Sequence, residues 1–429
     1  MSILVKYRVA VEYVESFSNS SIRKNIGKDK KDLNFFIKRT QYFLDLLGNP
    51  EKDFYYIHVT GTAGKGTVST TIQEILTASG KKTGLFTSPY VTTSIEKIRI
   101  GGMYISPEEF VAIVEYLKPF IATAHTGPYG GPSSFELFFT IALIYFRQQK
   151  CQWVVLEVGF GGRYDATNII SRPVVTAITN IDYDHTDFLG KTLREIATDK
   201  MGIIKPESSF FTSEQRPSLQ RLFQKTCRDV GAKFFAIKHQ RNYFEYNQEL
   251  VKTIARSLGI TDEYIDKGIH NTQLPCRFEI MQKNPVIVLD GAHNRAKIRS
   301  TIHNLQNCTF KKLYIIATIS DTKKDNRAIL EPLLSLPYST HIVFTQVKKG
   351  DRSSVSPTLL MSIARKYQKN KRSKTTLEII ENPHYALESI KKNAHENDFI
   401  LVTGSFFLAG ELRNEWISED WVLQNRRSF

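Results

Sequence analysis

Residues 55–67 read YYIHVTGTAGKGT, and this stretch decides the fold class of the chain. An apolar run of strand character, residues 55–59, leads into a turn in which Gly61, Gly64 and Gly66 surround Lys65 and Thr67 follows. Beyond the turn, apolar residues recur at helical spacing as far as Ser79 and Gly80. Proteins bind phosphates with this order of elements, because the N–H groups of the loop and the start of the helix attract anions. The stretch therefore predicts a nucleotide site in preference to an ordinary surface turn.

The loop is a compressed form of the common phosphate-binding loop. The common form has a glycine five residues before Gly64, where this chain has Val59. In such loops a lysine reaches the terminal phosphates and a hydroxyl ligates Mg²⁺, roles that fall here to Lys65 and Thr67. The loop residues that we expect to bind a nucleotide are Gly61, Thr62, Gly64, Lys65, Gly66 and Thr67.

The composition is that of an ordinary globular protein with an excess of positive charge. Of the 429 residues, 41% are hydrophobic and 24% are charged, and the length suits two domains better than one core. No apolar run could span a bilayer and the N-terminus lacks the layout of a signal peptide, so we expect a cytoplasmic protein. The net charge of +15 favours anionic partners. Because neither an RNA-binding aromatic signature nor a DNA-binding helix pattern stands beside the basic clusters at 28–31 and 366–374, we expect no nucleic acid as a partner, and we expect no membrane either.

Short apolar runs alternate with helical stretches, which predicts an α/β protein with parallel sheets. The expected strands are 55–59, 83–86, 153–158, 174–178 and 233–237 in a first series, and 286–289, 313–319, 341–345, 377–380 and 399–402 in a second. The first series predicts a P-loop-type parallel sheet domain wound by helices, over residues 1–283. The second predicts a smaller Rossmann-like domain, over residues 284–429.

Polar residues end or follow several of these strands, at the edge where open α/β sheets place their sites. Ser88, Glu157 and His185 are three of them. A carboxylate within an apolar strand costs free energy unless it is paired or binds a cation, so Glu157 is either a structural carboxylate or a metal ligand. A histidine such as His185, taken alone, is more often packed or hydrogen-bonded than a ligand. Together with Thr67, these residues are candidates for a Mg²⁺ site.

Three more polar residues stand in comparable places. Lys200 lies in TLREIATDKMGIIK, which we read as a short helix that ends at Gly202, and it is either an exposed lysine or faces the preceding site. Asp290 and His293 lie in VIVLDGAHN, directly after a strand of the second series. They mark either a capped turn or a loop that faces a ligand.

The motifs of this chain, taken in order, resemble those of the folylpolyglutamate synthase/dihydrofolate synthase family within the Mur ligase superfamily. The motifs are LLGNP, IHVTGTAGKGT, TSPYV, EKIRI, LEVGFGGRYDATN, ITNIDYDHTDFLG, DKMGIIKP, LPCRFE, VLDGAHN and VTGSFFLAGEL. Their order and spacing along most of the chain carry the resemblance. Members of this family are ATP-dependent ligases: a substrate carboxylate becomes an acyl phosphate, and the amine of L-glutamate attacks it to give an amide.

The resemblance implies roles for the residues above and adds further ones. The catalytic residues it implies are Lys65, Glu157, His185 and Lys200, and the metal ligands are Thr67, Ser88, Glu157, His185 and, when carbamylated, Lys200. Residues that would join the loop in binding ATP are Asn168, Arg277, Asp290 and His293. It also implies Mg²⁺ and a monovalent cation such as K⁺ as cofactors, a pterin or folate carboxylate as the acid substrate, and a monomeric protein.

The chain departs from the family pattern at several positions. Ala63 stands where the family loop has Asn, Cys276 where glycine is usual, and Arg295 where the family has Pro. Residues 15–35 replace the G-L-x-R-I segment that precedes LGNP in typical members. The alternative is therefore a ligase of the same chemistry that acts on another carboxylate and amino acid. A non-catalytic nucleotide-binding protein would be expected to lack Lys65, Glu157 or His185, and all three are present.

Overall fold

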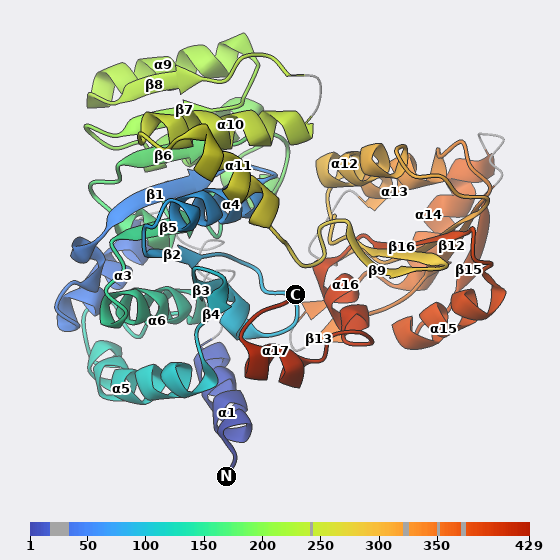
Figure 1. Ribbon diagram of the computed structural model, residues 1–429, viewed down its shortest axis with the longest axis horizontal. Helices are drawn as coiled ribbons and strands as arrows, with labels where there is room; N and C mark the ends of the chain where they lie inside the picture. Colours follow the sequence, from blue (N-terminus) through green and yellow to red (C-terminus); the bar gives the residue numbers. More distant parts are fainter. Residues whose placement is uncertain (18–33, 241–242, 321–325, 350–351, 370–374) are drawn as a thin grey trace. The chain divides into compact units, whose positions relative to one another are not determined.

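The computed structural model describes residues 1–17, 34–240, 243–320, 326–349, 352–369 and 375–429. The chain forms two compact units. Unit 1 comprises Met1–Gln273 with Leu423–Arg427 and Phe429, and unit 2 comprises Leu274–Val422 with Ser428. Figure 1 colours Met1–Gln273 from blue to yellow and the rest of the chain from yellow to red. Residues 18–33 of the divergent stretch 15–35, the basic cluster at 28–31 and residues 370–374 of the basic cluster 366–374 lie outside the described residues.

Unit 1 is built on an eight-stranded sheet with the order β4-β3-β2-β5-β1-β6-β7-β8. From β2 to β8 the neighbouring strands run parallel, whereas β3 and β4 add an antiparallel edge. The strands are β1 (Tyr55–Thr60), β2 (Thr83–Phe86), β3 (Ile98–Ile100), β4 (Met103–Tyr104), β5 (Trp153–Glu157), β6 (Val175–Ile178), β7 (Ser209–Thr212) and β8 (Lys233–Ala236). The predicted parallel sheet is thus confirmed for the five strands expected in this unit.

Helices cover both faces of this sheet (Figure 1). The helices are α1 (Ile3–Ser16), α3 (Asn34–Leu46), α4 (Lys65–Ala78), α5 (Pro107–His125), α6 (Ser134–Gln148), α7 (Thr186–Leu189), α8 (Leu193–Lys200), α9 (Pro217–Val230), α10 (Tyr243–Ser257) and α11 (Asp262–Asn271), with short 3₁₀ turns between them. Capping boxes fix the starts of α5, α6 and α8. Helix α4 instead begins at Gly64, in the left-handed region at φ 83°, with no capping side chain among the described residues. The N–H groups at the start of α4 therefore face the loop before it.

The final residues of unit 1 return to its antiparallel edge. The backbone N–H of Tyr104 donates to the Arg426 carbonyl at 2.8 Å, and the Arg426 Nε donates back to the Tyr104 carbonyl at 2.8 Å. The same guanidinium also reaches Glu109 and Tyr145. The edge strand β4 is thereby covered by a segment more than three hundred positions later in the sequence.

The core above β1, β5 and β6 is formed by α4, α10 and α11. Helices α4 and α11 approach each other closely at Gly268, where an added Cβ would lie 2.5 Å from the Ile75 Cα. Because the obstructing atoms are backbone atoms of α4, a side chain at this position could be accommodated only if one helix shifted. Gly268 therefore fixes the distance between α11 and the helix that starts at the phosphate loop.

We expect Gly268→Ala to destabilise the protein by about 1–3 kcal/mol through overpacking. Alanine is intrinsically the better helix residue by about 1 kcal/mol, so a loss of stability would report the contact and not the helix propensity. Urea unfolding monitored by circular dichroism measures the change. The control is Gly102→Ala, because a Cβ at Gly102 meets nothing within 4 Å. Equal stability of the Gly268 variant and the wild type would contradict the close approach.

Unit 2 is built on a six-stranded sheet with the order β15-β12-β11-β16-β10-β9. Its strands are parallel except for β9, which pairs antiparallel with β10. The strands are β9 (Glu279–Lys283), β10 (Val286–Leu289), β11 (Leu313–Ala317), β12 (Thr340–Phe344), β15 (Thr376–Ile379) and β16 (Phe399–Thr403), with a separate pair β13 (Lys348–Lys349) and β14 (Arg352–Ser353). The helices are α12 (Arg295–Leu305), α13 (Asn326–Leu334), α14 (Pro357–Lys369), α15 (Pro383–Asn393), α16 (Phe406–Arg413) and, at the junction with unit 1, α17 (Glu419–Asn425).

The division between the units falls ten residues before the predicted boundary of 283/284. Strand β9, placed in the first domain by the sequence, completes the sheet of unit 2. Its first residue, Glu279, also forms a buried ion pair with Arg413 of the same unit, at 2.9 Å. Pairing with β10 and this ion pair tie residues 279–283 to unit 2.

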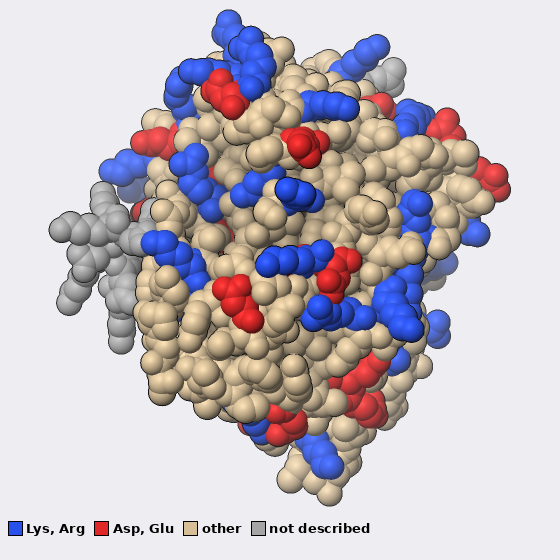
Figure 2. Space-filling view, turned by 90° about the vertical axis from the view of Figure 1, so that its left-hand side faces the viewer, with Lys and Arg blue, Asp and Glu red and all other residues tan. Residues whose placement is uncertain are grey.

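The charged surface of the protein mixes both signs. On the face shown in Figure 2, acidic side chains lie among the lysines and arginines. Among the helices that the structure describes, none combines the length and the apolar character needed to cross a membrane.

Candidate active site

The phosphate loop between β1 and α4 is held by the segment that follows β6. The Thr62 N–H donates to the Asn180 carbonyl and the Ala63 N–H to the Asn180 side-chain oxygen, both at 2.9 Å. The Thr179 hydroxyl donates to the Ala63 carbonyl at 2.6 Å. Gly61 has φ 146°, and a Cβ there would lie 1.9 Å from the Thr179 hydroxyl. Only glycine fits this approach of loop and strand end.

Lys65 and Lys200 meet at one backbone carbonyl. The Lys65 Nζ donates to the Gly61 carbonyl at 3.2 Å, and the Lys200 Nζ donates to the same oxygen at 3.1 Å. Lys200 is 4% exposed. Burial, and then the charge of Lys65, lower the pKa of Lys200 to about 7, although Asp199, Asp184 and Asp165 oppose the shift. Near neutral pH a large share of the Lys200 side chain is therefore an uncharged amine. Of the two readings of this lysine, the exposed helix lysine is wrong.

Glu157 is buried at the end of β5, beside the start of α4. A Cβ on Gly66 would lie 3.4 Å from a Glu157 carboxylate oxygen, and the Ser88 N–H donates to that carboxylate at 3.2 Å. Apart from His185, the residues predicted to hold Mg²⁺ in this unit would supply hard oxygen donors, which are the ligands Mg²⁺ prefers. Among the described residues, no group of three or more His, Cys, Asp or Glu could hold a metal alone. A magnesium site here would therefore draw on the hydroxyls of Thr67 and Ser88 as well as on Glu157.

His185 begins the short helix α7 in a left-handed conformation, with φ 51°. Its ring packs edge-on against Phe160 with a centroid distance of 4.9 Å, and its side chain is about half exposed. The histidine thus lies beyond the segment that holds the phosphate loop. Its role as a metal ligand stays a prediction.

The glycine-rich loop after β5 packs against the end of α8. A Cβ on Gly162 would lie 2.7 Å from the Lys200 carbonyl, so this loop touches the backbone of the buried lysine. Asn168, predicted to lie near the nucleotide, donates from its side chain to the carbonyls of Arg163 and Gly202 at 2.9 and 3.2 Å. It therefore joins the glycine-rich loop to the turn after α8. The structure gives it a positioning role, and contact with a nucleotide stays a prediction.

Arg277, Asp290 and His293 all belong to unit 2, and two of them, Arg277 and His293, lie against Phe406 at the start of α16. The Arg277 guanidinium lies over the Phe406 ring at 4.2 Å, and the His293 ring centroid is 5.8 Å from it. Asp290 is buried and accepts hydrogen bonds from the N–H groups of Phe278 and Ala292. Burial raises the pKa of Asp290, and the charge of Arg277 opposes the rise.

His293 itself is fixed on both sides of its ring. Its Nδ1 lies 2.8 Å from the Gly291 carbonyl, and its Nε2 lies 3.0 Å from the Lys297 ammonium. The carbonyl can only accept and the ammonium can only donate, so the neutral ring carries its proton on Nδ1. Sequence reasoning did not single out Lys297 or Phe406. Phe406 lies in the quoted motif VTGSFFLAGEL, immediately after a strand, which is the signal that could have identified it.

Two family models match the chain and together cover most of it. The Mur ligase middle domain matches residues 59–257, and the Mur ligase glutamate ligase domain matches residues 276–406. Among curated proteins, the dihydrofolate synthase/folylpolyglutamate synthase of Bacillus subtilis is 28% identical over 415 residues, which cover 87% of this chain and 93% of that protein.

Two solved structures show the same fold with nucleotides bound. Mycobacterium tuberculosis folylpolyglutamate synthase, complexed with ADP and AMPPCP, is similar with a TM-score of 0.79 at 25% identity, over 89% of this chain and 95% of that one. A bifunctional folylpolyglutamate synthase/dihydrofolate synthase with Mn, AMPPNP and L-glutamate bound has a TM-score of 0.75 at 25% identity, over 88% of this chain and 93% of that one.

Proposed function

This chain belongs to the folylpolyglutamate synthase/dihydrofolate synthase family of Mur ligases, and from that premise we propose that it is an ATP-dependent ligase. The reaction joins a carboxylate to the amine of L-glutamate. The carboxylate oxygen bonds to the γ-phosphorus of ATP as ADP leaves, which gives an acyl phosphate. The glutamate amine then attacks the acyl carbon and loses a proton, and phosphate leaves as the amide forms.

The observation that carries the proposal is the convergence of Lys65 and Lys200 on the Gly61 carbonyl at the phosphate loop. The first step brings two anions together, so the barrier depends on positive charge placed where negative charge develops. Lys65 lies in the loop and supplies such a charge without reorganisation. A surface turn would not bury a second lysine beside the first, because burial of an amine is costly.

Lys200 fits a second task. Carbon dioxide reacts with a neutral amine and not with an ammonium, and the pKa of about 7 leaves neutral amine available. Carbamylation would replace a cation that is repelled by Lys65 with an anion that pairs with it. The carbamate would also add an oxygen ligand for a metal.

Thr67, Ser88 and Glu157 are the residues that we propose to hold Mg²⁺, with His185 and the Lys200 carbamate as further ligands. When bound, Mg²⁺ neutralises charge on the phosphates and orients the γ-phosphate. The complexes of the relatives with Mn, AMPPNP and L-glutamate support a divalent metal and a nucleotide. In unit 2, we propose that Arg277, Asp290 and His293 bind ATP, since Arg277 and His293 both lie against Phe406 and the charge of Arg277 acts on the Asp290 carboxyl group.

The acid substrate that we propose is dihydropteroate, a folate, or both. The double name of the Bacillus subtilis relative supports either acceptor. A monomeric state, a cytoplasmic location and use of a monovalent cation stay predictions.

Phosphate release from Mg-ATP tests the function. We expect release only when glutamate is present together with dihydropteroate, dihydrofolate or tetrahydrofolate, and mass spectrometry should detect the product one glutamyl unit heavier. The control omits glutamate, which separates ligation from simple ATP hydrolysis. Protein that binds ATP but releases no phosphate with any pterin would instead favour a ligase with a different acid substrate.

A further inference from the structure

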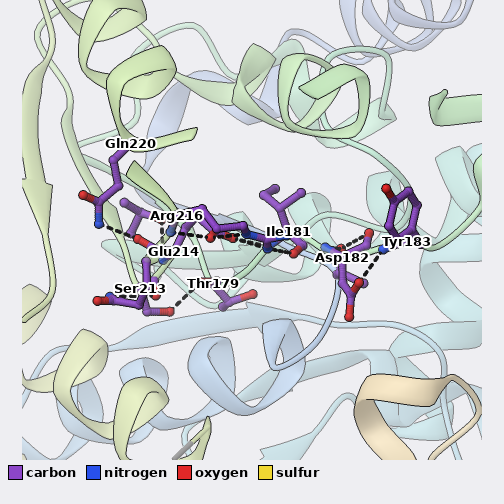
Figure 3. Close-up of polar contacts among 11 residues, drawn as sticks. Thr179, Ile181, Asp182, Tyr183, Ser213, Glu214, Arg216 and Gln220 are labelled. Atoms are coloured by element: carbon purple, nitrogen blue, oxygen red, sulfur yellow. Dashed lines mark hydrogen bonds and ion pairs between the residues drawn. The ribbon is translucent and has the colours of Figure 1, made fainter. Parts of the chain in front are cut away.

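An ion pair between the buried Glu214 and the half-buried Arg216 follows strand β7 and has no part in the chemistry described above. Glu214 is 3% exposed, and both of its carboxylate oxygens bind the Arg216 guanidinium at 2.7 Å (Figure 3). The Arg216 N–H also donates to this carboxylate at 2.9 Å. The Gln220 side chain donates to the Glu214 carbonyl at 2.6 Å and fixes the backbone of the turn. The pair is therefore rigidly placed at the start of α9.

Glu214 and Arg216 both form hydrogen bonds with the segment that follows the neighbouring strand β6. The Ile181 N–H donates to the Glu214 carboxylate at 3.0 Å, and the Arg216 guanidinium donates to the Ile181 carbonyl. Both backbone groups of one residue are thus bound by the two charged side chains, as Figure 3 shows. The Ser213 hydroxyl adds a bond to the Thr179 carbonyl. The side chains of Ser213, Glu214 and Arg216, which follow β7, therefore hold residues 179–181 in place.

The same segment holds the phosphate loop on its other side. The Thr62 hydroxyl donates to the Asp182 carbonyl at 3.1 Å and accepts from the Asp182 N–H at 2.9 Å. The contacts of Asn180 with Thr62 and Ala63 lie in the same segment. His185 follows three residues after Asp182. One short segment thus connects the ion pair to the loop and to a predicted metal ligand.

Stability alone gives little reason for this arrangement. Burial of the Glu214 carboxylate costs hydration, and the Arg216 side chain, 41% exposed, forms a pair that water weakens. Apolar residues of similar size often serve a fold as well. What an apolar pair could not do is bind the N–H and carbonyl of Ile181 at fixed positions. The bidentate geometry of arginine and carboxylate restricts orientation as well as distance.

We infer that Glu214 and Arg216 are positioning residues for nucleotide binding: they fix segment 179–182 and, through it, the conformation of the phosphate loop. The inference rests on the proposed function only in taking the loop to bind ATP. Glu214 and Arg216 then contribute to the affinity for the nucleotide and not to the rate of the chemical step. Their loss raises the Kd for Mg-ATP and leaves kcat at saturating ATP nearly unchanged.

The test measures Mg-ATP binding by calorimetry, with no acid substrate present. Glu214→Gln keeps the shape but places an amide N–H₂ against donors, and Arg216→Met removes the guanidinium. We expect each to raise the Kd about tenfold, as the loss of roughly one well-made buried polar contact would. Arg216→Lys keeps the charge without the two-pronged geometry and should restore part of the affinity.

Coupling to the loop distinguishes positioning from general stability. Thr62→Val removes both hydrogen bonds between the Thr62 hydroxyl and Asp182. If both substitutions act through the same segment, the Kd of the double variant Thr62→Val/Glu214→Gln should rise by less than the product of the two single-variant increases. Hydrogen exchange should also quicken in peptides that contain residues 60–66 and 179–185 of the Glu214 and Arg216 variants. This readout requires neither nucleotide nor turnover.

Two controls lie in the same unit. Phe223→Leu loosens the core beneath the same helix α9, where Phe223 packs on Phe210, without touching the ion pair. Arg256→Gln removes an exposed pair with Asp262, which has a distance of 2.9 Å. Both should keep the wild-type Kd. An unchanged Kd in the Glu214 and Arg216 variants, or an equal rise in Phe223→Leu, would overturn the inference.

The outcomes also separate this inference from the proposed function. Wild-type protein that binds Mg-ATP but forms no glutamyl product would count against the function, and a weaker Kd in the Glu214 and Arg216 variants would still support positioning. Wild-type protein that binds no nucleotide would overturn both.

Discussion

Lys65→Ala should reduce glutamate-dependent phosphate release by about 10³-fold or more, since it removes the loop cation from the phosphoryl transfer. The loss should appear in kcat and not only in the KM for ATP, because charge on the transferred group is greatest in the transition state. Lys200 cannot take over the task, because it is buried and its pKa is about 7, so its charge is incomplete at neutral pH. Steady-state kinetics at saturating ATP measure the effect.

The control for this variant is Lys81→Ala. Lys81 lies just beyond the other end of α4, with its ammonium 6.0 Å from the centre of the Trp153 ring, and its removal should leave the rate unchanged. Circular dichroism should confirm that both variants fold. Near-normal phosphate release by Lys65→Ala would show that the loop does not bind the transferred phosphate.

Lys200→Ala should lower the rate by about 10²-fold, the upper range for losing a residue that supports a metal site. Short carboxylic acids such as acetate should restore part of the activity, because they can place an anion where the carbamate stood. Kinetics with increasing acetate, at constant ionic strength, measure the rescue. Mass spectrometry under gentle conditions should detect the added CO₂ on the wild type.

Lys65→Ala provides the matched comparison for the rescue. An anion cannot replace the charge of Lys65, so acetate should not restore that variant. Full activity of Lys200→Ala without any acid would mean that the buried lysine serves only to pack the loop after β5 against α8.

The sequence predicted the elements whose signals are local. The apolar run, the glycines and the helical spacing around residues 55–80 are consecutive, and β1, the loop and α4 formed as expected. Ser88 and Glu157 were also placed correctly beside each other, since parallel strands bring their carboxyl ends to one edge. The same rule brought Asp290 and His293 to the end of β10.

Features that depend on partners distant in sequence were not predicted. Strand β7, of only four residues, is absent from the strands expected from the sequence. Because β7 was not predicted, Glu214 was not identified as a site residue either. Its carboxylate binds the segment after β6 only because β7 pairs with β6. The antiparallel strands β3, β4 and β9 are short or at sheet edges, where pairing and not pattern decides the direction. Asn180 follows a strand, as the other site residues do, yet its contact with Ala63 required knowledge of which loops meet.

The return of residues 423–427 to β4 sets an order of events during synthesis. Tyr104 can bind Arg426 only after the ribosome has synthesised all of residues 274–422. Closing a loop of this length costs more entropy than any local pairing, although the cost grows only slowly with length. The central strands of unit 1 can pair as soon as they emerge, whereas its β4 edge is completed last. A nascent chain therefore carries an uncovered sheet edge throughout the translation of unit 2, and this is the interval in which a chaperone would have a strand to protect.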